Sequence, residues 1–255
     1  MRRVRRAERL GAILEELSDG GAVDVGALSE RLRASPATIR RDLVLLDRQR
    51  LLTRTHGGAV AHGVAYELPL RYKAGRHQEE KRRIAAEAAS RVGEGMAIGL
   101  TGGTTTTEVA RALVGVDRLT VVTNALNIAS ELAIRRNLKI VVTGGWARSE
   151  SYELVGPIAD ATLEGLNLDV ACVGVDGISA EAGLTTHHDV EAHTNRTLME
   201  HARRVIVVAD GSKVGRAAFA RICPLEGVGE LITDASADRA ALAAIGEAGV
   251  EVTLV

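Results

Sequence analysis

Several residues that could bind a small anion follow directly after an apolar strand predicted to end at Leu100. Two glycines would let the backbone approach a ligand closely, and the N–H groups that open the next helix favour an anion. The hydroxyls that follow add further donors, so a phosphate group is the natural occupant. The alternative is a simple glycine turn with a threonine cap. The residues of this loop are Gly102, Gly103, Thr104, Thr105 and Thr106.

Polar residues also follow four other predicted strands. In an open parallel sheet, ligands bind beyond the carboxyl ends of the strands, so these residues are expected to line one pocket. Lys213 would add a positive charge to a bound phosphate, and the carboxylates would accept hydrogen bonds from sugar hydroxyls. The alternatives are a surface lysine, aspartates that stabilise tight turns and a glutamate in the first turn of a helix. The candidates are Thr123, Asn124, Gly144, Gly145, Asp176, Glu191, Asp210 and Lys213.

Other binding chemistries find less support. The glycine loop lacks both the Gly-Lys-Ser/Thr ending of a nucleoside-triphosphate loop and the Gly-x-Gly-x-x-Gly pattern of dinucleotide sites. His187, His188 and His193 lie near two acids, but their spacing matches no established metal site, and adjacent histidines in a strand point apart. Pocket-wall roles are the better interpretation of this histidine group. We therefore predict no metal, no cofactor and no catalytic residues.

Two rarer residue types add little chemistry. Trp146, the only tryptophan, follows the Gly144-Gly145 turn and is interpreted as packed core, with a cover over the pocket as the alternative. Cys172 and Cys223 lie in apolar surroundings without metal or redox spacing. No apolar run is long enough to span a bilayer, and the arginine-rich start lacks the apolar segment of a signal peptide. A cytoplasmic location with reduced thiols is expected.

A second kind of chemistry is indicated by the run from Ser35 to Leu43, Ser-Pro-Ala-Thr-Ile-Arg-Arg-Asp-Leu. Ser35 can cap a helix, and a proline fits the first turn. Ile39 and Leu43 then recur at helical spacing and form an apolar stripe. A short helix with a small residue at its start and arginines facing outward is typical of a DNA-recognition helix. The predicted DNA-contacting residues are Ser35, Ala37, Thr38, Arg40, Arg41, Arg54 and His56, the last two on a wing.

The charge distribution supports a polyanion partner. Of the 255 residues, the first 60 hold 12 arginines against 8 acids, which gives +4, whereas the remainder holds 20 bases against 25 acids, which gives −5. A positive end on an acidic body suggests a polyanion-binding module, and a solvated basic surface is the alternative. Aromatic residues make up 2% of the chain, too few for a base-stacking RNA platform, so duplex DNA is the better polyanion.

The periodicity divides the chain into three parts. Residues 1–60 predict three helices followed by a two-stranded tip, a winged helix-turn-helix. Residues 61–78 have no clear apolar face and are interpreted as a linker. In residues 79–255, helical segments alternate with short apolar strands, which predicts an α/β domain with a mostly parallel sheet.

The ordered motifs resemble the DeoR family of bacterial transcriptional regulators over nearly the whole chain. Motifs that carry the resemblance are Ser35–Leu43, Arg54–Ala59, Gly103–Thr105, Thr123-Asn124, Gly144-Gly145, Gly156-Pro157, Asp176-Gly177, Gly183–Thr185, Glu191-Ala192, Asp210–Lys213 and Ile232–Asp234. The resemblance implies a sensor domain shaped like ribose-phosphate isomerases and coenzyme A transferases. It also implies repression of sugar or carbohydrate metabolism genes, relieved by a phosphorylated sugar. One departure is Thr101, where many members have aspartate; Gly211 replaces a more usual serine.

Three functions therefore compete at this point. The leading prediction is a repressor that binds double-stranded operator DNA and a phosphorylated sugar, acting as a homodimer or homotetramer on repeated half-sites, away from any membrane. The second is a sugar-phosphate isomerase-like enzyme that carries a DNA-binding domain, with Glu191 and Asp210 as acid–base groups. The third is an activator, or a regulator that senses something unphosphorylated. The attached DNA-binding end favours sensing over turnover.

Overall fold

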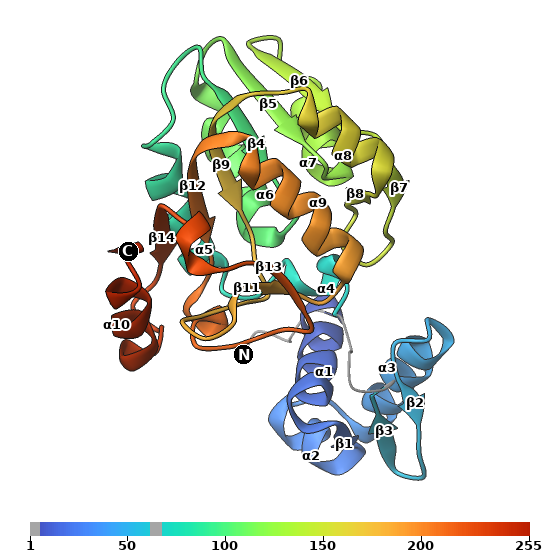
Figure 1. The fold of residues 1–255 in the computed structure, drawn as a ribbon. Helices are drawn as coiled ribbons and strands as arrows, with labels where there is room; N and C mark the ends of the chain where they lie inside the picture. The colour runs from blue at the N-terminus through green and yellow to red at the C-terminus, as the bar shows by residue number, and fades with distance from the viewer. Residues whose placement is uncertain (1–5, 62–67) are drawn as a thin grey trace. The chain divides into compact units, whose positions relative to one another are not determined.

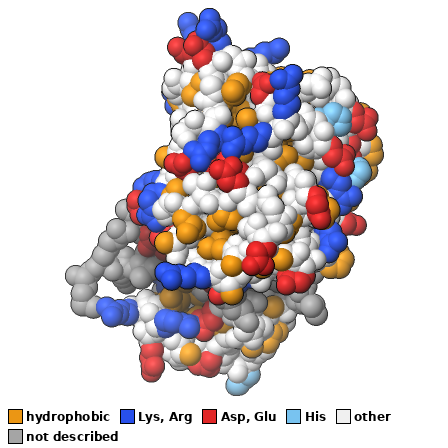
Figure 2. All heavy atoms as spheres, turned by 60° about the vertical axis from the view of Figure 1, so that its left-hand side comes forward, with side chains coloured by type: hydrophobic (Ala, Val, Ile, Leu, Met, Phe, Trp, Pro, Cys, Tyr) orange, Lys and Arg blue, Asp and Glu red, His pale blue; other side chains and the backbone are white. Residues whose placement is uncertain are grey.

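The computed structural model describes residues 6–61 and 68–255, which form two compact units (Figure 1). Contacts between Cα atoms divide the chain into Met1–Arg76 and His77–Val255. In the part of the chain that is described, no helix is long and apolar enough to cross a membrane. On the face drawn in Figure 2, basic and acidic side chains are interspersed.

The N-terminal unit is a winged helix-turn-helix, as predicted. Its helices are α1 (Arg6–Gly20), α2 (Val25–Arg31) and α3 (Pro36–Arg48). Its antiparallel sheet has the order β1 (Ala22–Asp24), β3 (Gly58–Val60) and β2 (Thr53–Arg54). Gly58 must lack a side chain, because a Cβ atom there would lie 1.9 Å from the carbonyl oxygen of Val23.

Capping residues fix where the helices of this unit begin. The Asp24 carboxylate accepts the backbone N–H of Gly26 at 2.7 Å and starts α2, and the Ser35 hydroxyl accepts that of Thr38 at 3.2 Å and starts α3. Behind these caps, aliphatic side chains that are at most 1% exposed form the core: Ile13, Leu14, Leu17, Leu28, Ile39, Leu43, Leu46 and Leu52. The caps and the apolar stripe together make the helix boundaries readable from the sequence.

The segment interpreted as a linker, residues 61–78, lies partly outside the described residues. In the described part, Leu68 and Leu70 are buried, and the short helix α4 (Leu70–Lys73) contacts α1. The Tyr72 hydroxyl donates to the Gln49 side chain at 2.6 Å. These residues thus pack onto the N-terminal unit.

A parallel seven-stranded sheet forms the centre of the C-terminal unit (Figure 1). From one edge to the other, its strands are β15 (Glu251–Leu254), β14 (Glu230–Thr233), β12 (Ala202–Val208), β9 (Leu168–Val173), β4 (Ala97–Leu100), β5 (Leu119–Thr123) and β6 (Leu138–Val142). All six neighbouring pairs are parallel. The predicted α/β domain with a mostly parallel sheet is confirmed.

Helices cover both faces of this sheet, because successive residues of its strands enter two different cores. Ala171 and Val173 of β9 face one core, and Val170 and Cys172 face the other. The first core is shared with α8 (Pro157–Glu164), α9 (Asp189–Glu200) and α10 (Arg239–Glu247). The second is shared with α5 (Gln78–Ala89), α6 (Thr104–Ala112) and α7 (Leu126–Leu132).

Short strands that periodicity did not predict complete the C-terminal unit. An antiparallel sheet has the order β10 (Gly177–Ser179), β11 (Gly183–Thr186) and β13 (Ala220–Cys223). Strands β7 (Trp146–Ala147) and β8 (Leu154–Val155) form a separate hairpin. Single 3-10 turns are η1 (Leu113–Gly115), η2 (Gly211–Lys213) and η3 (Leu225–Gly227). The hairpin and η2 both carry residues of the candidate site.

Candidate DNA-binding and effector-binding sites

The start of α3 presents its polar residues outward. Ser35, Ala37, Arg40 and Arg41 are exposed, and Thr38 is half-buried. The hydroxyls of Ser35 and Thr38 lie 2.9 Å apart and bond each other, so they fix the helix start as well as facing solvent. Arginine guanidinium groups here can reach base edges or phosphates of a DNA groove.

The wing carries the other two predicted DNA-contacting residues. Arg54 lies on β2 and His56 in the turn before β3, and both are exposed. Strands β2 and β3 contact α3 within the same unit. The helix start and the wing therefore belong to one folded element, which can present both to a duplex.

Asp42, the acid of the Arg-Arg-Asp motif, has a structural role that the sequence analysis missed. Its side chain is 2% exposed and accepts from Arg9 of α1 at 2.5 and 3.3 Å. This ion pair ties α1 to the recognition helix. The signal was present in the spacing, because Asp42 falls on the stripe of Ile39, Leu43 and Leu46, where an unpaired charge would be costly.

In the C-terminal unit, the glycine loop joins β4 to α6 at the carboxyl edge of the sheet. Gly103 occupies the N-cap with φ +135°, and no side chain caps the first turn of α6, whose amides have no intrahelical acceptors. The hydroxyls of Thr106 and Thr107 donate to the Gly103 carbonyl at 3.0 and 2.6 Å. The loop thus offers backbone amides, with Thr104 half-buried and Thr105 buried beside them.

The neighbouring strand ends hold the loop in place. Thr101 is fully buried, and its hydroxyl accepts from the Gly174 amide at 3.0 Å. The Thr123 hydroxyl donates to the Leu100 carbonyl at 2.7 Å. Asn124 is also fully buried and donates to the Asn195 amide oxygen at 3.3 Å, whereas its own side-chain oxygen has no partner among the described residues. Thr101 and Thr123 therefore brace the strand ends, and Asn124 retains an acceptor.

Gly144 and Gly145 serve close packing of the backbone. Both have positive φ angles, and a Cβ atom at Gly145 would lie 2.7 Å from the Val155 carbonyl oxygen. The interpretation of Trp146 as packed core is wrong. Its side chain is 66% exposed, because it stands on the short strand β7 and its ring lies over Gly156.

The acidic candidates lie in one network with two cations. The Thr186 hydroxyl lies 2.8 Å from a Glu191 carboxylate oxygen and 3.2 Å from one of Asp176. Lys213 Nζ lies 3.6 Å from Asp176, and the Arg148 guanidinium is ion-paired with Glu191. The structure thus brings Asp176, Glu191 and Lys213 together and adds Arg148 and Thr186.

Asp210 is held as a carboxylate by its neighbours. Burial opposes ionisation, but a hydrogen bond from Ser212 and the charges of Lys81 and Lys213 lower the pKa of Asp210. Lys81 Nζ lies 3.7 Å from Asp210, and the lysine is only 4% exposed. The sequence analysis missed Lys81, although it lies on the apolar stripe of α5 with Ile84, Ala85 and Ala88.

A further carboxyl group, Glu153, reaches this network from the residue before β8. It is 1% exposed and accepts the Gly102 amide at 2.6 Å. Burial and the nearby Glu191 raise the pKa of Glu153 well above its ordinary value. The network therefore runs from the glycine loop through Glu153 and Glu191 to Asp176 and Lys213.

The three clustered histidines lie beside different carboxylates: His187 near Asp176, His188 near Asp189 and His193 near Asp160. Within residues 6–61 and 68–255, no group of three or more His, Cys, Asp and Glu residues could hold a metal ion. Burial raises the thiol pKa of Cys172 to about 12 and that of Cys223 to about 11, so neither is reactive near neutral pH.

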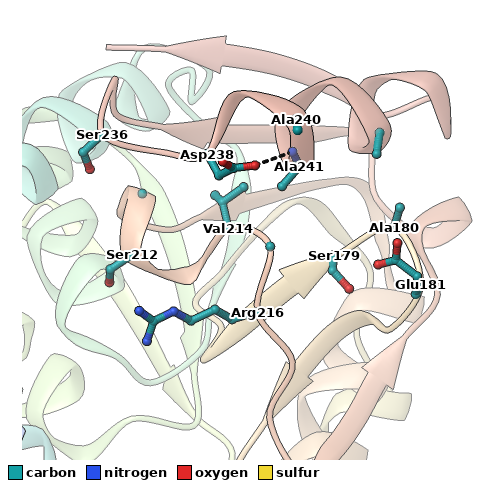
Figure 3. A pocket seen from close by; sticks show the side chains of 13 residues that line it. Ser179, Ala180, Glu181, Ser212, Val214, Arg216, Ser236, Asp238, Ala240 and Ala241 are labelled. Atoms are coloured by element: carbon teal, nitrogen blue, oxygen red, sulfur yellow. Dashed lines mark hydrogen bonds between the residues drawn. The ribbon is translucent and has the colours of Figure 1, made fainter. Parts of the chain in front are cut away.

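A hollow of about 730 Å³ is lined in part by residues of η2 (Figure 3). Ser212, which bonds Asp210, lines this hollow, whereas the glycine loop does not. Figure 3 shows Asp238 capping α10 there, through its bond to the Ala241 amide at 2.8 Å. Alanine, serine and glycine form most of its wall, and its charged residues are Glu181, Arg216 and Asp238.

A winged helix-turn-helix with exposed arginines, joined in one chain to an α/β unit with polar strand ends, defines a DNA-binding transcriptional regulator. The family model of the DeoR-like helix-turn-helix domain matches residues 9–63, and that of the DeoR C-terminal sensor domain matches residues 76–235. This chain therefore belongs to the DeoR family of transcriptional regulators, and the alternative of an isomerase-like enzyme is not supported.

Two relatives are similar over nearly their whole length. The chain is 38% identical over 247 residues to the HTH-type transcriptional regulator GlpR of Haloferax volcanii, covering 96% of each chain. It is 33% identical over 232 residues to the glycerol-3-phosphate regulon repressor of Escherichia coli, covering 91% of this chain and 92% of the relative. Ribose 5-phosphate isomerase A from Methanocaldococcus jannaschii is 19% identical, with a TM-score of 0.40 over 54% of each chain, a likeness that carries no argument about function.

Proposed function

We propose that this chain represses genes of sugar or carbohydrate metabolism and leaves its operator when a phosphorylated sugar binds the C-terminal unit. Lys81, Arg148 and Lys213, each beside a carboxylate, together with the open amides of α6, carry this proposal. Amides and cations suit a phosphoryl group, whereas carboxylates suit sugar hydroxyls. The name of the Escherichia coli relative, a glycerol-3-phosphate regulon repressor, supports a phosphorylated effector.

In this proposal, separate sets of residues bind the phosphoryl group, the sugar hydroxyls and the operator DNA. The phosphoryl group binds the amides of the glycine loop, from Gly102 to Thr105, and the ammonium group of Lys213. The sugar hydroxyls donate to Asp176, Glu191 and Asp210, with Asn124 as a further acceptor. The operator is bound by the exposed residues of α3 and the wing, through Arg40 and Arg41 to base edges or phosphates and through Arg54 and His56 to phosphates.

Release of DNA requires that the effector bind the low-affinity state more tightly than the DNA-bound state, since only differential binding shifts an equilibrium. One winged domain reads a short half-site, so we propose a homodimer or homotetramer that acts on repeated half-sites in the cytoplasm. A repressor of this kind transmits effector binding as a change of conformation or of assembly.

A thermal-shift screen tests the effector class. Each phosphorylated sugar is paired with the same sugar lacking phosphate, and a rise in Tm for phosphorylated members alone supports the proposal, because bound ligand stabilises the native state. Lys213→Ala should abolish most of the shift, whereas the matched control Lys139→Ala, at an exposed position of β6, should keep it. If no phosphorylated compound raises the Tm, the proposed effector class is wrong.

A further inference from the structure

The carboxyl group of Glu153 lies directly in front of the first amide of the glycine loop. Its Oε1 accepts the Gly102 N–H at 2.6 Å. A Cβ atom placed on Gly102 would come within 2.4 to 2.7 Å of the Cγ, Cδ and Oε1 atoms of Glu153. The side chain therefore fills the space that an acceptor group from a ligand would occupy at this amide.

The other oxygen of the same carboxyl group lacks a conventional donor. Oε2 is buried and has no hydrogen-bond partner among the described residues. The neighbouring group is the Glu191 carboxylate, which is ion-paired with Arg148 and lies 2.8 Å from the Thr186 hydroxyl. Burial and the adjacent negative charge of Glu191 raise the pKa of Glu153 well above its ordinary value. Glu153 is therefore the neutral member of the pair.

We propose that Glu153 is an internal competitor for the effector site, which holds the Gly102 amide until a phosphoryl group displaces it. The inference rests on the proposed function and adds a specificity-determining residue to it. A neutral carboxyl oxygen is a weaker acceptor than a phosphate oxygen, because charge-assisted hydrogen bonds are roughly twice as strong. A phosphorylated sugar can thus displace Glu153 from the Gly102 amide. A neutral sugar hydroxyl forms too weak a hydrogen bond with this amide to displace it.

Displacement of Glu153 would change the conformation of the β7–β8 hairpin next to it. Glu153 directly precedes β8, and Val155 of β8 pairs with Trp146 of β7. The Leu154 amide donates to the Asn124 carbonyl at 2.7 Å, so the hairpin is joined to the end of β5. Because the chain has a single tryptophan, its fluorescence reports on this hairpin alone.

The test measures the affinity of the full chain for inorganic phosphate in wild type, Glu153→Ala and Glu153→Gln. The alanine variant lacks the competitor, so its Kd should fall about tenfold, the size of one exchanged hydrogen bond to a charged group. Glutamine keeps an acceptor for the Gly102 amide and a donor for Glu191, so its Kd should match the wild type. Trp146 fluorescence should respond to phosphate in the wild type and much less in Glu153→Ala.

The outcomes separate this inference from the proposed function. Phosphate binding by Glu153→Ala with wild-type affinity, or more weakly, overturns the competitor role and leaves the effector site standing. Absence of phosphate and sugar-phosphate binding in every variant overturns both. Circular dichroism establishes that the variants fold. Should Glu153→Ala fail to fold, Glu153→Ser, whose hydroxyl is too short to reach Gly102, must show the same tighter binding.

Discussion

The two units of this chain arrange their charged residues in opposite ways. In the N-terminal unit, Arg40 and Arg41 stand exposed above an aliphatic core, and the one buried acid of α3, Asp42, supports the fold. In the C-terminal unit, the charges proposed to bind the effector are themselves buried or half-buried and paired. DNA binding can therefore be changed with little effect on stability, whereas changes at the sensor site disturb both ligand and fold.

The largest expected effect comes from removing a core side chain of the N-terminal unit beneath its exposed DNA-contacting residues. Leu43→Ala removes a side chain that is 1% exposed and should lower the free energy of unfolding of this unit by about 3 kcal/mol. Operator binding should be lost, whereas the thermal shift with the sugar phosphate persists. Urea unfolding with separate probes for the two units checks this, and loss of effector binding as well would contradict their independence.

A surface substitution on the same helix should change binding without changing the fold. Arg41→Ala should weaken operator affinity by roughly ten- to a hundredfold, the cost of one lost base or phosphate contact, at an unchanged Tm. Fluorescence anisotropy at fixed salt measures it, since protein–DNA affinity depends steeply on salt. Arg48→Ala, exposed near the other end of α3, is the matched control. Equal affinities for Arg41→Ala and wild type would refute the recognition-helix assignment.

At the sensor site, Lys213→Ala tests whether a paired cation serves the ligand. Its ammonium group lies 3.6 Å from Asp176, and the lysine side chain is about a quarter exposed. After the substitution, the Asp176 carboxylate still has the Thr186 hydroxyl and solvent as hydrogen-bond donors. The Kd for the sugar phosphate should rise about tenfold, the loss of one charge-assisted contact. Isothermal titration calorimetry checks this, and operator affinity without effector should stay as in wild type. An unchanged Kd would exclude Lys213 from the site.

The last effect, small at each step of pH, is a pH dependence that comes from Glu153. Its raised pKa means that the native chain keeps a proton that the unfolded chain releases above the ordinary value of 4.5. Wild-type stability therefore falls as pH rises through the window between that value and the native pKa, by at most about 1.4 kcal/mol per pH unit. Glu153→Gln lacks this loss, so its stability advantage should grow between pH 5 and pH 8 in urea unfolding. A constant difference would show that Glu153 is charged.

Local patterns predicted most of the fold. Capping by Asp24 and Ser35, the stripe of Ile39 and Leu43, and the alternation of apolar strands with helices are all set by neighbours in sequence. The strand-end rule also selected Asp176 and Lys213 as candidates, whereas Glu191 was selected from the start of a predicted helix. Two-residue strands such as β7 and β8 were not predicted, because they are too short to show an alternation of apolar and polar residues.

What the sequence could not show depends on partners that are distant along the chain. Asp42 is paired with Arg9, Lys81 with Asp210, and Glu153 with Gly102 and Glu191. Asp42 and Lys81 are each a charged residue on an apolar helix stripe. This pattern predicts that the residue is buried, but it does not predict its partner. Glu153 leaves none, because its hairpin has no periodicity. Trp146 was misplaced because residue type alone does not reveal that β7 lacks a covering layer.

The central claim is that a phosphorylated sugar and operator DNA bind this chain antagonistically. The direct measurement is anisotropy of a DNA fragment from the promoter region next to the chain's own gene, titrated at constant salt with each sugar phosphate and its unphosphorylated counterpart. We expect that one phosphorylated compound weakens DNA binding, that DNA weakens its binding by the same factor, and that the unphosphorylated sugar does neither. Release by the unphosphorylated sugar, or tighter DNA binding with the phosphorylated one, would contradict it.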